Sequence, residues 1–167
     1  MKIPAVALLI KQMTNDLSLL LTERNIADPL MVGIHTGGAW VAKSLHQQLS
    51  ISQPLSMIDI TFYRDDFTQI GLHPTVNTSS LPVTIDDQHI ILVDDAISSG
   101  RTIRAALNEL FDYGRPASVI LVALIDLPGR HLPIQPDIIG EQLDLPPQQR
   151  VKLRGPDNMH LELIQVN

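Results

Sequence analysis

The sequence predicts an α/β domain built on a mostly parallel, twisted sheet flanked by helices. Three observations point to this fold class. Short apolar runs alternate with segments of helical period, two of those runs are nearly continuous, and small polar residues or glycine follow the runs. Strands that alternate with helices lie parallel, joined by right-handed crossovers.

Size and composition fit one domain over residues 1–167. The chain has 167 residues, 44% of them hydrophobic, and no cysteine, which excludes disulfides and thiolate chemistry. A chain of this length buries roughly 70% of its unfolded surface, so we expect a substantial core. Twelve Lys and Arg against eighteen Asp and Glu give a net charge of −6. This charge disfavours nucleic acid as a partner, but not one bound phosphate group.

The N-terminal apolar stretch predicts an amphipathic helix of a cytoplasmic protein. Residues 3–10 are far fewer than the roughly 20 that a membrane span needs, so we expect no membrane partner. The stretch continues into residues that share one helical face, namely Ile10, Met13, Leu17, Leu20 and Leu21. The alternative is a weak secretion signal, although a small-residue cleavage site is missing.

A strand, a turn and a helix are expected next. Residues 30–34 form a short apolar run, and Gly37 and Gly38 behind it break regular structure. From Trp40, which we expect in the core, to Leu49, apolar residues recur every four positions, as in a helix. Residues 55–63 are again strand-like.

The central part of the chain is the most regular. Residues 89–93 predict a buried strand, and residues 119–125 predict another that is covered on both faces. Residues 94–100 between them are polar and small. A helix then follows as far as Gly114, with one face made of Ile103, Leu107, Leu110 and Phe111.

Two segments lack this regularity. Residues 64–81 show neither period, and loops longer than about 12–15 residues tend to be functional, so we expect a mobile loop there. Residues 126–167 contain several prolines, which preclude a long helix. Alternating runs at residues 151–153 and 161–163 predict short edge strands. We therefore expect a small C-terminal hood with edge strands over residues 126–167.

The strongest chemical signal follows the strand at residues 89–93. Ligands of a parallel sheet bind outside the carboxyl ends of its strands. Small residues and hydroxyls at positions 98–102 predict a monophosphate cradle of backbone amides at the start of a helix. Asp94 and Asp95 would repel that phosphate unless they face the hydroxyls of a ribose, where their charge stabilises cation character at the anomeric carbon. Alternatively, both acids cap the following helix and Gly100 is only a turn.

Residues 94–102 resemble the phosphoribosyl diphosphate signature of type I phosphoribosyltransferases. Residues 59–66, 93–107, 114–116 and 132–134 are similar, in the same order, to the family of bifunctional pyrimidine operon regulators and uracil phosphoribosyltransferases (PyrR). The resemblance runs from about residue 23 to 153. It implies the type I phosphoribosyltransferase fold and transfer of a phosphoribosyl group from phosphoribosyl diphosphate to uracil, which gives UMP and diphosphate.

The resemblance also implies which residues form the site. Asp94 and Asp95 match the ribose-binding acids and are catalytic, as is Arg64, which opens the loop that closes over the reaction. Asp126 and Arg130 lie in the hood, where Arg130 and main-chain groups read the base. The remaining substrate-binding residues are Thr36, Gly37 and Gly38 of the diphosphate loop and Ala96, Ile97, Ser98, Ser99, Gly100, Arg101 and Thr102 of the 5′-phosphate loop.

Cofactor and partners follow from the same resemblance. Mg²⁺ is implied because a leaving diphosphate needs its charge neutralised, and a hard divalent ion does this with few protein ligands. No residue is assigned as a metal ligand, and Asp94 and Asp95 act on the ion at most indirectly. The expected partners are phosphoribosyl diphosphate, a pyrimidine base and further copies of the chain in a dimer or tetramer.

The sequence departs from the family pattern at two positions. Relatives usually have an arginine in the diphosphate loop, where this chain has Gly37, and an aromatic residue where it has Ser98. The missing positive charge predicts weaker donor binding. Gly37→Arg should therefore lower the KM of the donor if residue 37 lies beside the diphosphate.

Two alternatives from other function classes were weighed. The first is a nucleotide-sensing, RNA-binding transcription attenuator of pyrimidine genes with weak or no catalysis. RNA binding needs cations, yet Gln135 stands where relatives tend to be basic, and the cations that do cluster are Arg150, Lys152 and Arg154. The second is a response-regulator receiver domain, which also pairs acids after a strand, but near its start rather than after ninety residues.

Overall fold

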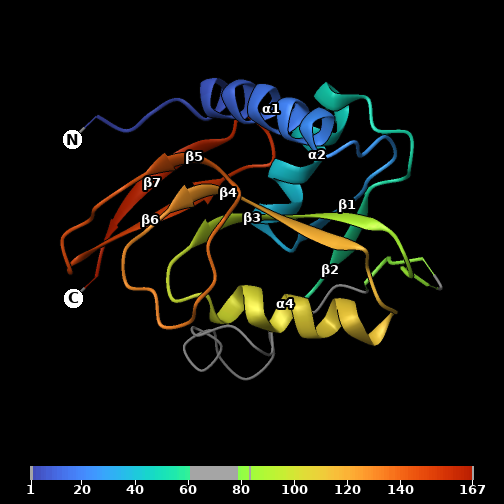
Figure 1. Ribbon diagram of the computed structural model, residues 1–167. Helices are drawn as coiled ribbons and strands as arrows, with labels where there is room; N and C mark the ends of the chain where they lie inside the picture. The colour runs from blue at the N-terminus through green and yellow to red at the C-terminus, as the bar shows by residue number, and fades with distance from the viewer. Residues whose placement is uncertain (1, 61–78, 83, 167) are drawn as a thin grey trace.

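The computed structural model describes residues 2–60, 79–82 and 84–166. Within them, a five-stranded sheet lies between two helical layers (Figure 1). Its strands are β1 (Leu30–Ile34), β2 (Ser56–Ile58), β3 (His89–Ile97), β4 (Ser118–Asp126) and β5 (Ile138–Gln142). All neighbouring strands are parallel, in the order β2-β1-β3-β4-β5. The predicted α/β class with a mostly parallel sheet is confirmed.

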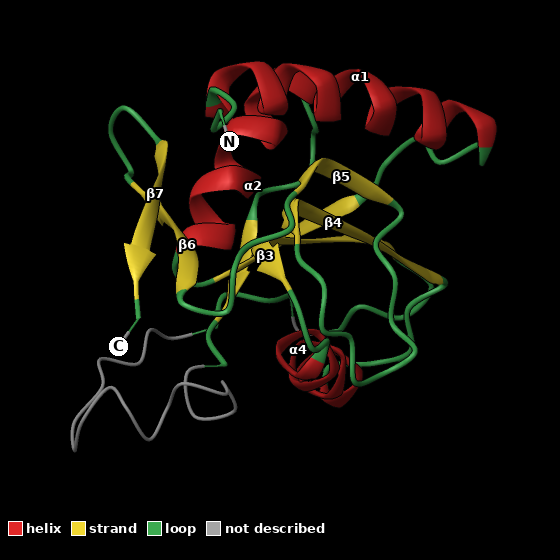
Figure 2. Ribbon diagram, turned by 90° about the vertical axis from the view of Figure 1, so that its left-hand side faces the viewer, coloured by secondary structure: helices red, strands yellow, loops and turns green. Residues whose placement is uncertain are grey.

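The helices of the described residues are α1 (Val6–Glu23), α2 (Gly37–Leu49) and α4 (Arg101–Asp112). The first two cover one face of the sheet and α4 covers the other (Figures 1 and 2). Side chains alternate between the faces along a strand, so Met31 and Ile91 pack with α1 and α2, whereas Leu30 and Ile90 pack with α4. The sheet is therefore buried on both faces, as its continuous apolar runs predict.

A second, two-stranded sheet follows the central one. It is the antiparallel hairpin of β6 (Gln149–Arg154) and β7 (His160–Gln165), which Figure 2 shows beside α2. Leu153 and Leu161 of this hairpin are buried in the same apolar cluster as residues of α1 and α2. The edge strands expected at residues 151–153 and 161–163 are thus confirmed.

Several element boundaries differ from the expectation. Helix α2 begins at Gly37, so the two glycines lie inside its first turn rather than in a turn before it. Strand β3 continues past Val93 through both acids to Ile97, because its ladder with β4 continues to Asp126. Strand β5, at the edge of the central sheet, falls within residues 126–167, where edge strands were expected, but lies outside the runs at 151–153 and 161–163. Phe111 is 56% exposed and does not share the buried face of α4.

The expected strand at residues 55–63 and the loop at 64–81 are described only in part. Of the strand, β2 covers Ser56–Ile58. Residues 61–78 lie outside the described residues, and so does Arg64. In the described ranges, no helix combines the length and the apolar character needed to cross a membrane.

Candidate active site

The carboxyl ends of β1 and β3 bring the predicted site residues together. Strand β1 leads through Thr36 into α2, and β3 leads through Ser98 and Gly100 into α4. The two strands are parallel neighbours, so both helix starts lie at the same edge of the sheet. The twin acids lie in β3 between these two helix starts.

The two acids have different surroundings. Asp94 is buried, with 4% of its surface exposed, and its Oδ1 accepts the backbone N–H of Asp95 at 2.9 Å. Asp95 is half-buried and lines a cavity of about 750 Å³ together with Thr36, Gly37 and Trp40. Neither acid caps α4, whose N-cap residue is Gly100, so the capping alternative is wrong.

The start of α2 packs directly on the acids because its first two residues, Gly37 and Gly38, are glycines. A β-carbon on Gly37 would lie 2.5 Å from Oδ2 of Asp95, and one on Gly38 would lie 2.6 Å from the carbonyl oxygen of Val93. At Gly38 the clash is with backbone, whereas at Gly37 it is with the carboxylate of Asp95, a side chain that can move. The effect of Gly37→Arg on donor binding stays a prediction.

The predicted 5′-phosphate loop surrounds a small pocket. Residues from Ala96 to Ile103 line a space of about 90 Å³ between the end of β3 and the start of α4. Gly100 turns the chain with a φ of +90°, a conformation that strongly favours glycine. The hydroxyl of Ser99 accepts the backbone N–H of Arg101 at 3.2 Å. Arg101 itself is exposed and is absent from the lining of this pocket, which differs from its expected role.

Arg130 connects the hood to this loop. Its guanidinium donates to the backbone carbonyl of Ser98 at 2.6 Å, to Oδ1 of Asp126 at 2.7 Å and to the side chain of Gln135 at 3.3 Å. Asp126 is buried at the end of β4, so the ion pair is largely shielded from water. In the structure Arg130 thus joins the hood to the phosphate loop, and its expected role in reading the base stays a prediction.

A third cavity, of about 260 Å³, lies under the hood. Leu127, Pro128, Ser98 and Arg150 are among the residues that line it. The three cavities adjoin one another, because Ala96 lines both the first and the second, Ser98 the second and the third, and Arg150 the first and the third. All three lie next to one another at the edge of the sheet.

Sequence reasoning missed part of this lining. Trp40 packs against the apolar core, as expected, but it is only half-buried and also lines the cavity of 750 Å³. Leu127 and Pro128 belong to the hood segment 126–132, whose main-chain groups the resemblance had assigned to the base. Arg150 was considered only as part of a basic cluster, and its position 55 residues after Asp95 gave no sign of contact with the site.

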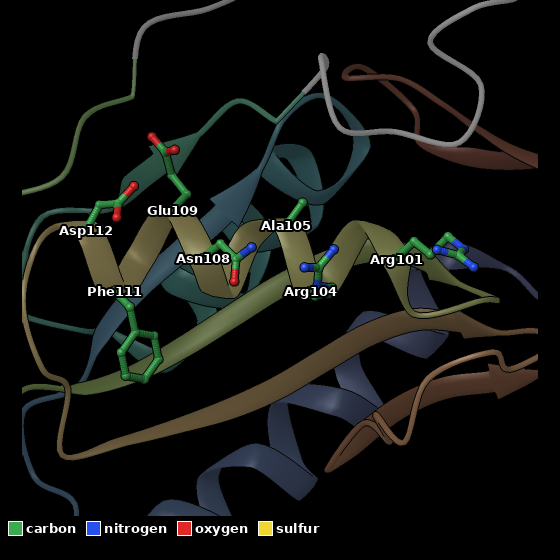
Figure 3. Close-up of a pocket in the computed structure, with 7 residues that line it drawn as sticks. All are labelled: Arg101, Arg104, Ala105, Asn108, Glu109, Phe111 and Asp112. Atoms are coloured by element: carbon green, nitrogen blue, oxygen red, sulfur yellow. The ribbon is translucent and has the colours of Figure 1, made fainter.

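Another pocket, of about 650 Å³, lies on the outer face of α4 (Figure 3). Arg101, Arg104, Glu109 and Phe111 are among its lining residues, and all of the lining comes from this one helix. Neither twin acid is part of it, and its side chains carry both signs of charge. We therefore place the reaction at the strand ends rather than here.

A metal ion would have few direct protein ligands at this site. In the described part of the chain, no three His, Cys, Asp or Glu side chains are grouped so that they could hold an ion. Magnesium keeps several waters and is often bound through one or two carboxylates and substrate phosphates. Half-buried Asp95, beside a cavity that could hold a polyanion, fits an ion of that kind.

Comparisons with known proteins agree on one family. Residues 2–144 match the model of the phosphoribosyl transferase domain. The chain is 58% identical to the bifunctional protein PyrR of Pseudomonas aeruginosa over 162 residues, which cover 97% of this chain and 95% of that protein. It is 55% identical to the protein of the same name from Pseudomonas syringae over 163 residues, 98% and 96% of the two chains.

Solved structures share the fold at lower identity. A hypoxanthine phosphoribosyl transferase of Trypanosoma cruzi superposes with a TM-score of 0.67 at 18% identity and covers 86% of this chain and 78% of its own. A purine phosphoribosyltransferase of Pyrococcus horikoshii gives a TM-score of 0.60 at 20% identity, covering 81% and 82%. The likeness to these two structures concerns the fold alone.

Proposed function

The chain belongs to the phosphoribosyltransferase family, and within it to the bifunctional proteins PyrR, and from this premise we propose that it transfers the phosphoribosyl group of phosphoribosyl diphosphate to uracil. The observation that carries the proposal is the packing of a glycine start of α2 against Asp95, beside three adjoining cavities. Three spaces of different size suit the three parts of the reactants, which are the 5′-phosphate, the ribose with its diphosphate, and the base.

In the proposed reaction, the bond between C1′ of the ribose and a diphosphate oxygen breaks, and its electron pair leaves with the diphosphate. N1 of uracil forms the new bond to C1′, and the proton of N1 is released to water. The products are UMP, diphosphate and a proton. Positive charge develops at C1′ as the old bond breaks, so a fixed carboxylate nearby stabilises the transition state.

We propose that Asp95, which lines the large cavity, accepts a hydrogen bond from a ribose hydroxyl, with Asp94 beside it. The amides at positions 98–100 and the start of α4 bind the 5′-phosphate in the pocket of 90 Å³. Leu127 and Pro128 offer main-chain groups to the base in the pocket of 260 Å³. The role of Arg64 stays a prediction, since it lies outside the described residues.

Mg²⁺ is part of this proposal. When bound to the diphosphate, it neutralises charge on the leaving group. The chain contributes Asp95 at most to its coordination, because the described residues provide no cluster of ligands. The chain's own work is then to position the two reactants and to exclude water from the activated sugar.

Release of diphosphate from phosphoribosyl diphosphate tests the proposal directly. Uracil, cytosine, orotate, guanine and hypoxanthine are offered in turn, with a reaction that lacks any base as the control. We expect release with uracil to exceed release with every other base. A faster reaction with a purine would refute the choice of base, and no release with any base would refute catalysis.

RNA binding is a second candidate function. The relatives at 55–58% identity are named bifunctional, and Arg150 and Lys152 are exposed cations on β6. The net charge of −6 opposes it, and so does Gln135 in the hood. A filter-binding titration with single-stranded RNA tests this activity. We also propose that the protein is cytoplasmic and forms a dimer or tetramer, and sedimentation of the purified protein measures the number of chains.

A further inference from the structure

One wall of the cavity of about 750 Å³ consists of residues that have no role in the proposed reaction so far. Thr36, Gly37 and Asp95 form one side of it, and residues of β6 form another. Among the described residues that line it, every cationic side chain belongs to β6: Arg150, Lys152 and Arg154. Positive charge therefore reaches this cavity from the hairpin and not from the loop that precedes α2.

The side of the cavity opposite β6 lacks a cation because Gly37 has no side chain. A β-carbon there would lie 2.5 Å from Oδ2 of Asp95, so a larger residue requires that carboxylate to move. Asp95 adds a negative charge of its own. A diphosphate in this cavity would lose part of its hydration, and an anion in such a place needs a cationic partner. A cationic side chain that faces the diphosphate therefore has to come from another part of the chain.

The three cations of β6 differ in what lies opposite them on β7. Arg154 forms an ion pair with Glu162. Lys152 stands directly across from the same Glu162 in the strand register. Arg150 stands across from Ile164, and within the described residues its guanidinium forms no hydrogen bond or ion pair. Among the described residues, no carboxylate pairs with Arg150 or stands across from it on β7.

Arg150 also lies where two cavities meet. It lines the cavity that contains Asp95 and the pocket of 260 Å³ under Leu127 and Pro128. From this position Arg150 borders the space proposed for the ribose and its diphosphate. Because a guanidinium donates two parallel hydrogen bonds to a phosphate group, it suits this task better than an ammonium group.

We propose that Arg150 binds the diphosphate group of the donor and supplies the positive charge that the start of α2 does not carry. This inference rests on the proposed function and adds a residue to it. It assigns a small polyanion to a cation cluster that the sequence alone suggested for RNA. It also explains why a loop with Gly37 is compatible with a diphosphate site.

Binding of inorganic diphosphate tests the proposal without any turnover. Trp40 is the only tryptophan of the chain and lines the same cavity, so its fluorescence reports on the site. Inorganic diphosphate is titrated in the presence of Mg²⁺ into the unchanged protein, Arg150→Gln, Arg150→Lys and Lys152→Gln, and calorimetry repeats each titration. Arg115→Gln is the matched control, because Arg115 is exposed in the loop before β4, at the opposite edge of the sheet.

We expect Arg150→Gln to raise the dissociation constant of diphosphate about tenfold or more, as the loss of one charge-assisted pair predicts. Arg150→Lys should fall between it and the unchanged protein, Lys152→Gln should have a smaller effect, and Arg115→Gln should have none. In steady state, Arg150→Gln should raise the KM of phosphoribosyl diphosphate by a similar factor, with a much smaller change in the KM of the base.

Unchanged diphosphate affinity in Arg150→Gln would overturn the inference. So would a loss of RNA affinity in this variant with diphosphate binding intact, since the hairpin would then serve a nucleic acid. Failure of the proposed function looks different: the unchanged protein would transfer to no base, while the diphosphate titration would still distinguish Arg150→Gln from Arg115→Gln. Equal melting temperatures of the variants would support the reading of these results as effects on binding.

Discussion

The starts of α2 and α4 are the same kind of structure used in two different ways. Each helix follows a parallel strand at the same edge of the sheet. The N-cap residues, Thr36 and Gly100, form no side-chain cap, so amides of both first turns can face an anion. The same topology thus places two candidate anion sites at one edge of the sheet.

What differs is the space in front of each helix. At α2, two glycines allow the helix to pack on β3, and the carboxylate of Asp95 lies against Gly37. At α4, Gly100 has a positive φ and turns the chain around a pocket of about 90 Å³. The glycines of α2 allow the helix to lie close to β3, whereas Gly100 allows the positive φ of the turn before α4. A carboxylate therefore lies against the start of α2, and a pocket lies in front of the start of α4.

The largest effect is expected at the residue between the two helices. Asp95→Asn keeps the shape of the side chain but removes the charge, so turnover should fall by about 10²- to 10³-fold, the usual loss of one electrostatic group in a transition state. The melting temperature should change little, because Asp95 is half-exposed to its cavity. Asp112→Asn, on the exposed end of α4, is the matched control, and full activity of Asp95→Asn would remove this acid from the mechanism.

Substitution of Gly37 or Gly100 by alanine should have a different effect at each helix start. In Gly37→Ala the new β-carbon displaces the carboxylate of Asp95, so kcat should fall about tenfold to a hundredfold with a small change in stability. In Gly100→Ala the nearest atom to the new β-carbon is 3.5 Å away, but the positive φ is strained. The free energy of unfolding should fall by about 1–3 kcal/mol.

Thermal melts and initial rates of both variants measure this contrast. Gly37→Ala should have a low kcat and a near-normal melting temperature. Gly100→Ala should have a lower melting temperature and a smaller change in kcat. If both variants lost mainly stability, the close contact between α2 and Asp95 would be a packing feature without a role in positioning the acid.

The sequence predicted the part of this comparison that depends on local pattern. Continuous apolar runs predicted β1, β3 and β4, and the rule that ligands bind at the carboxyl ends of parallel strands placed Asp94, Asp95 and the segment 98–102 together. The paired strands of the hairpin also followed from alternation. Each of these signals lies within a few consecutive residues.

Features that depend on distant contacts were not predictable in this way. Strand β5 is short and polar at its end, and Gly140 fits there because its position against Leu124 and α1 leaves no room for a side chain. The continuation of β3 through two acids depends on its ladder with β4. Arg150 reaches the site only because the hairpin packs on α2. Such contacts join residues that the sequence separates by dozens of positions.

The smallest effect is expected at Arg130, a hood residue that contacts the loop before α4 through the carbonyl of Ser98. Arg130→Lys keeps a positive charge for buried Asp126, but one ammonium group cannot also reach the carbonyl of Ser98, now 2.6 Å from the guanidinium. The phosphate loop should then be held less firmly, so the KM of phosphoribosyl diphosphate should rise about threefold while kcat changes little. Gln135→Leu, which removes only the contact at 3.3 Å, is the control. A rise in the KM of uracil instead of the KM of the donor would indicate that Arg130 binds the base. A residue that shapes only the phosphate loop should change the KM of the donor alone.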